Sequence, residues 1–378
     1  MEKIKLGDLC NPCQGQIKVQ PGTIIDYIDI SSIDNNSKTV SGYQTMTFAE
    51  APSRARKAVK EGNILVSTVR PNLNAVAIVE DATPNMTVAS TGFCVLDCKE
   101  NVDKRFVFNF CKSKAFIDEM VAQATGASYP AVSDKIVRTA LIPSYSFHDQ
   151  IKIGEILDKV SLIIAKRKSE LTYLDNLVKA RFVEMFGDEK KLMTMDEVCS
   201  IITDGTHQPP KFKDTGIPFI FVSNITGDKI TYDAEKFIDQ DTYDVLIKRT
   251  PIEIGDILLS TVGSYGHPAV VKTDKRFLFQ RHIAYLKPKK ELVDSDYLHG
   301  AILSPDAQRQ IEKGVKGIAQ KTLNLSEIKK MKIPVPSLDR QKEFAVFVLQ
   351  VDKSKAVIQK SLEEAQLLFD SLMQQYFG

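Results

Sequence analysis

Tryptophan is absent from the sequence, and neither sign of charge is in clear excess: 50 basic and 48 acidic residues give a net charge of +2. A nucleic-acid-binding surface would therefore have to gather positive charge locally. No apolar run approaches the roughly 20 residues that span a bilayer, and Met1–Lys5 lack the apolar stretch of a secretory signal. We therefore expect a cytoplasmic protein, in which 19 Phe and 11 Tyr supply the bulky core residues.

The cysteines are scattered and include a single C-x-x-C motif, Cys10–Cys13. A structural zinc site would need a second pair or histidines at ligand spacing, and the sequence has neither. Disulfides are rare in the reducing cytosol. We therefore expect ordinary thiols, no metal and no disulfide framework at Cys10, Cys13, Cys94, Cys98, Cys111 and Cys199.

Motifs of the common nucleotide-dependent enzymes are also missing. The sequence has no G-x-x-x-x-G-K-S/T loop for ATP and no glycine-rich loop for S-adenosylmethionine, and Pro209-Pro210 has the wrong neighbours for a methyltransferase motif. Pro305-Asp306 followed by Glu327-Ile328-Lys329 does satisfy the loose P-D…(D/E)-x-K pattern of Mg²⁺-dependent nucleases. Because so short a pattern arises often by chance, we predict no catalytic centre and keep a nuclease as the alternative.

What the sequence does contain is an internal repeat of half its length. Its landmarks recur at an offset near 191 residues, which is 377 minus 186. They are Phe186-Gly187 and Phe377-Gly378, segments 61–69 and 254–262, Gly126 and Gly317, and Gln150 and Gln341. So many co-linear matches indicate one duplicated unit rather than an array of small repeats.

Each copy begins with a mixed part, residues 1–149 or 188–338. Short β-branched runs between glycine turns predict strands. These runs are 64–69, 75–79, 88–96, 217–222, 257–262 and 269–271. Helical patterns follow near 104–124 and 296–313. The mixture predicts a compact α/β (α+β) domain in each copy, with the strand order left open.

Each copy ends with a long helical pattern, residues 150–187 or 339–378, whose apolar residues recur at steps of three and four. About 36 residues make a helix of roughly 54 Å, longer than the radius of a typical domain. We predict that the two helices pair antiparallel as a coiled-coil spacer between the two domains; a core role inside one domain is the alternative. The predicted packing residues are Ile156, Val160, Ile164, Leu171, Leu174, Val178, Phe347, Val351, Ile358, Leu362, Ala365 and Leu368.

The order of the motifs resembles the type I restriction–modification specificity subunits, each of which carries two target recognition domains. In the second half the resemblance rests on Thr203–Pro210, Gly216–Ile220, Val222–Ile225, Gly255–Ser260 with Gly263 and Gly266, Gly317–Asn324, and Ile333–Pro336 with Gln341. In the first half it rests on Gly126–Ala131 and Ile142-Pro143. The first copy lacks the Asp204–His207 segment, as expected of two domains that read different sequences.

This resemblance implies a non-catalytic subunit that reads a bipartite, asymmetric DNA site and holds other subunits. It implies two modification (methyltransferase) subunits and restriction/translocation subunits as partners. S-adenosylmethionine, ATP and Mg²⁺ would be bound by those partners and not by this chain. Two alternatives stay open: the specificity component of a related system without an ATP-driven motor, and a coiled-coil adaptor that does not bind DNA.

Polar residues on loops are the candidates for contacting bases, because Asn and Gln can pair bidentately with adenine and Arg with guanine. In the first half these are Ser67, Thr68, Arg70, Asn72, Asn74, Ser128 and Tyr129. In the second half they are Thr206, His207, Gln208, Asn224, Thr261, Ser264, Tyr265, His267, Gln320 and Lys321. Basic clusters at 54–60 and 313–316 are candidate phosphate contacts or, equally, solvated charged faces.

Geometry limits the expected target. Half-sites one helical turn apart, roughly 34–36 Å, lie on the same face of B-DNA. A spacer helix of roughly 54 Å could hold two small domains at about that separation. We therefore predict two short, unlike DNA segments with an unread gap of fixed length.

Overall fold

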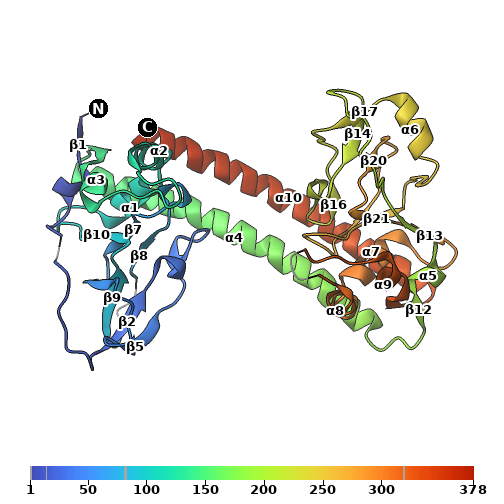
Figure 1. Cartoon of the computed structure of the whole chain (residues 1–378), viewed down its shortest axis with the longest axis horizontal. Coiled ribbons are helices and arrows are strands. Elements are labelled where there is room, and N and C mark those ends of the chain that lie inside the picture. Colours follow the sequence, from blue (N-terminus) through green and yellow to red (C-terminus); the bar gives the residue numbers. More distant parts are fainter. Residues whose placement is uncertain (1, 14, 81–82, 318–319) are drawn as a thin grey trace. The chain divides into compact units, whose positions relative to one another are not determined.

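The computed structural model describes residues 2–13, 15–80, 83–317 and 320–378 (Figure 1). Ile318 and Ala319 of the Gly317–Asn324 motif lie outside these residues. The chain divides into two compact units. The first unit comprises Met1–Ser169 with Gln359–Gly378, and the second comprises Glu170–Ile358. Within the described residues, none of the helices is long and apolar enough to cross a membrane.

The first unit contains two sheets, in the strand orders β10-β7-β8-β4-β3 and β5-β2-β9-β6, and a separate antiparallel pair, β1-β11. The strands are β1 (Lys3–Lys5), β2 (Ile24–Ile28), β3 (Ile33–Asp34), β4 (Thr39–Val40), β5 (Gln44–Thr47), β6 (Ala55–Ala58), β7 (Ile64–Ser67), β8 (Val76–Ile78), β9 (Met86–Ser90), β10 (Phe93–Leu96) and β11 (Leu141–Pro143). All of β7 is buried, with Ile64 and Val66 in one core cluster and Leu65 in another. Burial on both faces explains its continuous aliphatic sequence.

Three short helices cover the first sheet: α1 (Lys104–Lys112), α2 (Lys114–Gln123) and α3 (Asp134–Thr139). Their N-caps are Asp103, Ser113 and Ser133, each of which accepts hydrogen bonds from backbone N–H groups of the first turn. The Ser113 cap explains why the helical pattern predicted over 104–124 is two helices instead of one.

The second unit repeats this plan. Its sheets have the orders β13-β21-β18-β19, β17-β14-β20 and β15-β16, and β12 pairs with β22 as β1 pairs with β11. The strands are β12 (Leu192–Thr194), β13 (Cys199–Asp204), β14 (Ile217–Ile220), β15 (Ile225–Thr226), β16 (Lys229–Ile230), β17 (Phe237–Ile238), β18 (Ile257–Ser260), β19 (Pro268–Val270), β20 (Leu278–Phe279), β21 (Ile283–Pro288) and β22 (Lys332–Pro334). The helices are α5 (Met195–Val198), α6 (Gln240–Leu246), α7 (Ser295–Leu303), α8 (Pro305–Gly314) and α9 (Leu325–Lys330).

The structure corrects the extent of several predicted strands. The run 88–96 is divided between β9 and β10 by a turn at Gly92, where an added Cβ would lie 2.8 Å from Ile30 Cδ1. The run 217–222 ends as strand β14 at Ile220, and a 3-10 helix, Val222–Asn224, follows it. A turn interrupts the β-branched sequence at Gly92, and a 3-10 helix closed by the Phe221 N to Asn224 Oδ1 bond does so after Ile220.

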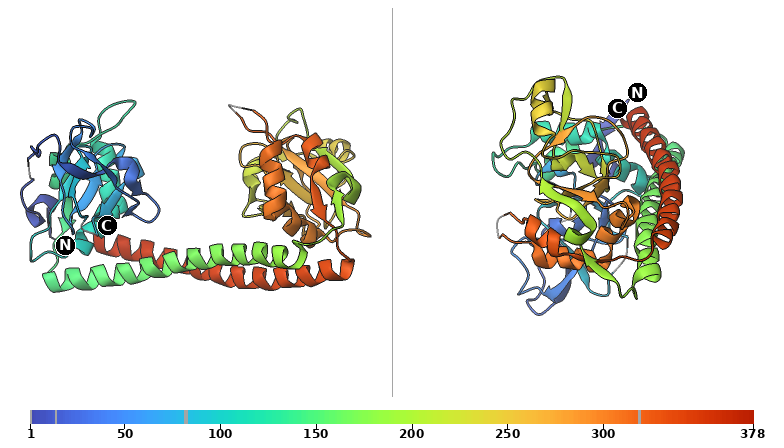
Figure 2. Two further views of the ribbon diagram at one scale, coloured as in Figure 1. Left: turned by 90° about the horizontal axis from the view of Figure 1, so that it is seen from below. Right: turned by 90° about the vertical axis from the view of Figure 1, so that its right-hand side faces the viewer.

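Two helices of 40 residues each, α4 (Phe147–Phe186) and α10 (Leu338–Phe377), contribute to both units. They begin slightly before the predicted starts at 150 and 339. In the second unit Asp175 contacts Lys355 and Arg181 contacts Glu343, so partner numbers fall in α10 as they rise in α4. The helices therefore run antiparallel and side by side within the unit (Figure 2), as predicted.

The last phenylalanine of each long helix packs into an aromatic cluster. Phe377 lies 5.3 Å from Phe106 in the first unit, measured between ring centroids. Phe186 lies 5.0 Å from Tyr297 in the second unit. Tyr297 follows Phe106 at the repeat offset, so each copy's helix ends in the core built by the other copy. This reciprocal packing explains why Phe-Gly closes both halves of the sequence.

Most of the predicted packing residues lie in the helix pair. Val160, Ile164 and Val351 are buried, and the half-buried ones are Leu171, Leu174, Val178, Phe347, Ile358, Leu362 and Ala365. The prediction is wrong for Ile156 and Leu368, which are 39% and 52% exposed. Their neighbours Leu157 and Phe369 contribute to the core instead. An α-helix turns every 3.6 residues, so a pattern assigned by heptads drifts off the packed face.

One hydrogen-bond pattern fixes the start of each long helix. Gln150 Oε1 accepts from Asp103 N at 3.1 Å, and Gln341 Oε1 accepts from Asp294 N at 2.8 Å. Both glutamine side chains also donate to the carbonyl five residues earlier, Tyr145 O or Pro336 O. The same side chain thus joins the long helix to the N-cap residue of α1 or α7.

Candidate DNA-recognition loops

Each unit presents a pair of loops held together by backbone hydrogen bonds. In the first unit the pair is 68–74 and 125–131. Thr125 and Ala131 exchange two N–H···O bonds of 3.0 and 2.9 Å, which close the second loop. The two loops are joined by Arg70 N donating to Pro130 O at 2.7 Å and Val132 N donating to Thr68 O at 2.9 Å.

Glycine makes the tight 125–131 loop possible. Gly126 has a φ of +104°, and an added Cβ there would lie 2.9 Å from Tyr129 O. At the loop tip the Tyr129 side chain is 69% exposed, and the Arg70 guanidinium lies 4.9 Å from its ring centroid. An exposed aromatic ring can stack on bases, and a guanidinium beside it can contact phosphate.

The second unit builds the same pair from 261–267 and 316–322. Lys316 and Thr322 exchange N–H···O bonds of 3.0 and 2.9 Å, and Leu323 N donates to Thr261 O at 2.8 Å. Gly317 has a φ of +106°, close to that of Gly126. The described parts of the two loop pairs therefore share the two loop-closing bonds and one inter-loop bond near the repeat offset, although their side chains differ.

A further turn, Asp204–His207, adds charge to the second unit. Asp204 Oδ2 lies 2.9 Å from His207 Nε2, and its other oxygen accepts from Arg249. Gly205 is pressed against β20, because a Cβ there would lie 2.2 Å from Phe279 O. The exposed Arg281 is held nearby by its backbone N–H, which donates to Thr206 O at 3.1 Å. This turn thus gathers His207, Arg249 and Arg281 on one surface.

The histidine beside Arg281 stays neutral near pH 7. Burial and the Arg281 guanidinium lower the pKa of His282. Arg281 Nε donates to His282 Nε2 at 3.4 Å, which requires that nitrogen to be unprotonated. His282 therefore adds no positive charge to this surface near pH 7.

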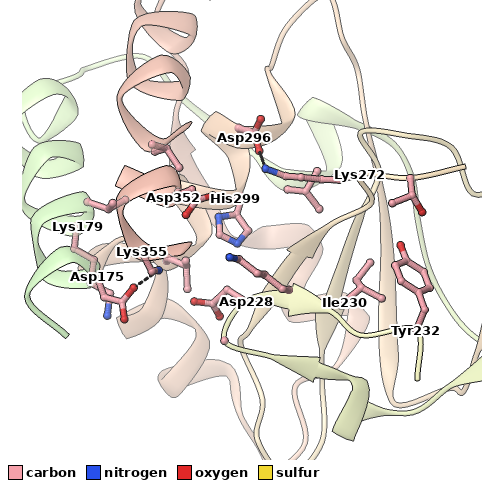
Figure 3. Close-up of a pocket in the computed structure, with 18 residues that line it drawn as sticks. Asp175, Lys179, Asp228, Ile230, Tyr232, Lys272, Asp296, His299, Asp352 and Lys355 are labelled. Carbon is pink, nitrogen blue, oxygen red and sulfur yellow. Dashed lines mark hydrogen bonds and ion pairs between the residues drawn. The ribbon is translucent and has the colours of Figure 1, made fainter. Parts of the chain in front are cut away.

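The turn between β15 and β16 connects the loop 261–267 to a pocket of about 440 Å³ (Figure 3). Asp228, in this turn, lies with Oδ1 3.2 Å from His267 Nδ1 and also lines the pocket. The pocket wall contains the ion pairs Lys272–Asp296 and Lys355–Asp175. Within the described residues His299 Nε2 is buried without a hydrogen-bond partner, and burial lowers the pKa of this ring.

Most of the predicted base-contacting residues are on the surface. Those with exposed side chains are Arg70, Asn72, Ser128, Tyr129, His207, Gln208, Ser264, His267, Gln320 and Lys321. Thr206 and Tyr265 are half-buried, and Tyr265 packs against the core. The surface position of these residues is compatible with DNA contact, which stays a prediction for each of them.

The expectation of exposed loop positions is wrong for Ser67, Thr68, Asn74, Asn224 and Thr261, which are all buried. Ser67 and Thr68 donate to backbone carbonyls at 2.9 Å, and Asn74 donates to Cys111 O at 2.9 Å. Asn224 accepts from Phe221 N at 3.0 Å and so closes a turn. These polar side chains stabilise the loops from inside.

Sequence reasoning missed Arg249 and Arg281. Arg249 follows Asp204 by 45 residues, so no local pattern joins the two. Conversely, much of the predicted basic cluster at 54–60 is engaged within the unit. Arg54 pairs with Asp29, Lys57 with Asp134 and Lys60 with Asp97.

The nuclease pattern does not converge in space. Pro305 begins α8 after the Ser304 cap, and the exposed Asp306 pairs with Arg309 in the same helix. Glu327 lies in the first turn of α9, and Lys329 pairs with Asp196. Pro305 therefore marks the boundary between α7 and α8, so the helical pattern predicted near 296–313 is two helices. The described residues contain no group of three His, Cys, Asp or Glu side chains that could hold a metal ion.

Comparisons with curated proteins point to one family. Residues 187–367 match the family model described as "Type I restriction modification DNA specificity domain". The type I restriction enzyme EcoBI specificity subunit of Escherichia coli is 22% identical over 316 residues, which cover 74% of this chain and 66% of that protein. The MjaVIII specificity subunit of Methanocaldococcus jannaschii is 20% identical over 311 residues, covering 74% and 71%. The chain spans about two thirds of the length of these two relatives.

Solved structures share the fold. One, from work on complex assembly and conformational transition of the type I R-M system, has a TM-score of 0.61 at 23% identity and covers 100% of this chain and 97% of its own. The type I restriction–modification S subunit from M. genitalium has a TM-score of 0.57 at 14% identity, with 100% and 96% covered. The likeness to these structures shows a fold shared with type I restriction–modification specificity subunits, and the second half of the chain, residues 187–367, matches the DNA specificity domain of that family.

Proposed function

We propose that this chain is the DNA-binding specificity subunit of a type I restriction–modification complex and reads a bipartite, asymmetric site. The observation that carries the proposal is the loop pair built twice, with the two loop-closing bonds and one inter-loop backbone bond repeated and with different side chains. A repeated scaffold with variable tips suits two domains that bind DNA in the same way and distinguish different bases.

The side chains at each loop pair suggest how the two halves differ. The first unit offers Arg70, Asn72 and Tyr129, which supply a guanine-pairing guanidinium, an adenine-pairing amide and a stacking ring. The second unit offers Gln208 and the arginine-rich surface near the Asp204 turn. Two unlike sets of donors and acceptors should select two unlike half-sites.

We further propose that α4 and α10 set the spacing of the half-sites. Target recognition domains at 1–149 and 188–338 would be separated by spacer helices at 150–187 and 339–378. A 40-residue helix is about 60 Å long, enough to relate domains that bind one turn of B-DNA apart. The gap between the half-sites should then have a fixed length.

The same helices are our proposed platform for partner subunits. In the second unit Tyr173, Val346, Leu349 and Val357 are each more than half exposed. Exposed apolar and aromatic side chains on a helix are typical of a protein interface. We propose two modification subunits and restriction/translocation subunits as partners in the cytoplasm, with S-adenosylmethionine, ATP and Mg²⁺ bound by those subunits. A related complex without an ATP-driven motor would use this chain in the same way.

The experiment maps methylated positions in DNA from cells that carry this chain with its modification subunits. We expect methylation at a single asymmetric site made of two short segments and a constant gap. Replacing residues 1–149 with those of another family member should change one segment and leave the other unchanged. A change in both segments, or a palindromic site, would contradict the proposal that each domain recognises its own half-site.

A second experiment addresses the nuclease alternative. Purified chain incubated with duplex DNA and Mg²⁺ should leave the DNA intact. Cleavage that is lost in Asp306→Ala, and retained in the matched surface variant Asp370→Ala, would instead assign catalysis to this chain.

A further inference from the structure

The C-x-x-C motif contains a cysteine whose structural partner is elsewhere in the sequence. Cys10 and Cys98 face each other in an isolated antiparallel bridge of the first unit. Asn11 N donates to Asp97 O at 2.7 Å, and Lys99 N donates to Leu9 O at 3.0 Å. These bonds flank the cysteines, so Cys10 and Cys98 form a non-hydrogen-bonded pair, the position at which opposite side chains approach most closely.

This position suits a disulfide. Opposite Cα atoms in such a pair are about 4.5 Å apart, and disulfides span Cα separations of roughly 4.4–6.8 Å. The separation lies at the short end of that range, where strain makes a bond easier to reduce. Cys10 is buried beside the half-buried Cys98, so a small peroxide has to pass Cys98 to reach the Cys10 sulfur.

The surroundings favour a thiolate at Cys10. Arg138 donates to the carbonyls of Gly7, Cys10 and Asn11, which holds its guanidinium against this turn. Its other terminal nitrogen, Nη1, is buried without a hydrogen-bond partner among the described residues. A hydrogen bond from the Cys98 thiol and the charge of Arg138 lower the pKa of Cys10, whereas the same contact and burial raise that of Cys98. Cys10 is therefore the nucleophile of the pair and Cys98 the resolving thiol.

We propose that Cys10–Cys98 is a reversible redox-modification site, which closes to an intramolecular disulfide when the protein meets a peroxide. The Cys10 sulfur attacks one peroxide oxygen, the O–O bond breaks, and hydroxide leaves and takes up a proton, giving a sulfenic acid and water. The Cys98 sulfur then attacks the sulfenic sulfur; the S–S bond forms, the S–O bond breaks, and the departing hydroxide leaves as water with the Cys98 proton. Two thiols lose two electrons, and one peroxide becomes two waters.

Closing this bond links the N-terminal segment to the end of β10 across 88 residues of sequence (98 minus 10). A cross-link that closes so long a loop restricts the unfolded chain strongly. We expect the melting temperature of the first unit to rise by roughly 5–15 °C on oxidation and to return to its reduced value with dithiothreitol.

The test treats the full chain with hydrogen peroxide, blocks remaining thiols with N-ethylmaleimide, and maps tryptic peptides without reduction. Cys10 and Cys13 share peptide 6–18, and Cys94 and Cys98 share peptide 61–99. Four single variants therefore assign the linkage. Cys10→Ser and Cys98→Ser should abolish the cross-linked peptide, whereas Cys13→Ser and Cys94→Ser should retain it.

Melting curves give an independent readout. Peroxide should raise the melting temperature of the wild type and of Cys13→Ser, and leave that of Cys98→Ser unchanged. A Cys10–Cys13 linkage, a linkage between two molecules, or sulfinic acid at Cys10 without a cross-link would overturn the proposal. Because every readout is made without DNA, the result is independent of the proposed function.

Discussion

Substituting Gly126 by alanine should weaken DNA binding at one half-site only. The residue has a φ of +104°, which L-amino acids rarely adopt, and the added Cβ would lie 2.9 Å from Tyr129 O. Backbone strain of this kind costs roughly 1–3 kcal/mol. The 125–131 loop can escape it by giving up its closed turn, which moves Tyr129 away from Arg70.

The loss of affinity follows from that cost. If DNA binds only the closed loop, the strain appears in the binding free energy, and affinity falls by roughly 5- to 150-fold. The loop is exposed, so the melting temperature should change little. Gly42→Ala is the matched control, because Gly42 is exposed in the same unit with nothing within 4 Å of its added Cβ.

The assay uses the complex reconstituted with its modification subunits and three duplexes: the mapped site, and the same site with either half scrambled. Scrambling the half read by the first unit should remove the difference between Gly126→Ala and wild type. Scrambling the other half should preserve it. Unchanged affinity of Gly126→Ala for the intact site, or an equal loss in Gly42→Ala, would refute the role assigned to this loop.

Other predictions concern charge, packing and thiols. Asp204→Asn should release His207 and Arg249 and alter selectivity in the second half-site alone, which methylation mapping would show. Phe344→Ala should lower the free energy of unfolding by about 3–5 kcal/mol in urea titrations, because four aromatic rings meet there; a loss below 1 kcal/mol would contradict that packing. Lys112→Met should stabilise the chain at pH 7. Burial lowers the Lys112 pKa to about 8. The buried charge therefore destabilises the folded chain fully below pH 8, and this destabilisation decreases as the pH rises toward 10.5, the pKa of lysine in the unfolded chain. The free energy of unfolding should rise with pH in that window in the wild type and not in the variant. Cys13, the exposed cysteine among those described, should react first with Ellman's reagent in the folded protein.

The elements that sequence alone identified are those whose signal is periodic. The long helices α4 and α10 repeat their apolar residues every three or four positions, and the duplication places them twice. The strands β7 and β18 were found because burial on both faces demands an uninterrupted aliphatic run. Apolar periodicity and aliphatic runs depend only on residues that are close in sequence, so both can be recognised without a structure.

The loop residues show where such reasoning stops. Asn72 and Asn74 are two positions apart and look equivalent in sequence, yet Asn72 is exposed and Asn74 donates to Cys111 O. Arg249 joins the candidate surface through its ion pair with Asp204, and no pattern in the sequence between them predicts this contact. Burial of a polar side chain is decided by a distant carbonyl, so only the folded chain distinguishes a structural amide from one that is free to contact DNA.

The two units bind the long helices through the same hydrogen bonds but carry different side chains on their loops. The scaffold is therefore separate from the candidate DNA-binding surface. Gln150 and Gln341 bind the N-cap residues of α1 and α7 with the same pair of bonds. Thr125 with Ala131, and Lys316 with Thr322, close the loops through backbone atoms alone. Because these bonds use main-chain groups and one glutamine in each copy, residues at the loop tips can change without loosening either the loop or its attachment to the helix. New half-site specificities should therefore arise by substitution at the loop tips. Substitution of Gln150 or Gln341 should instead weaken DNA binding to the same extent whichever sequence the tips recognise.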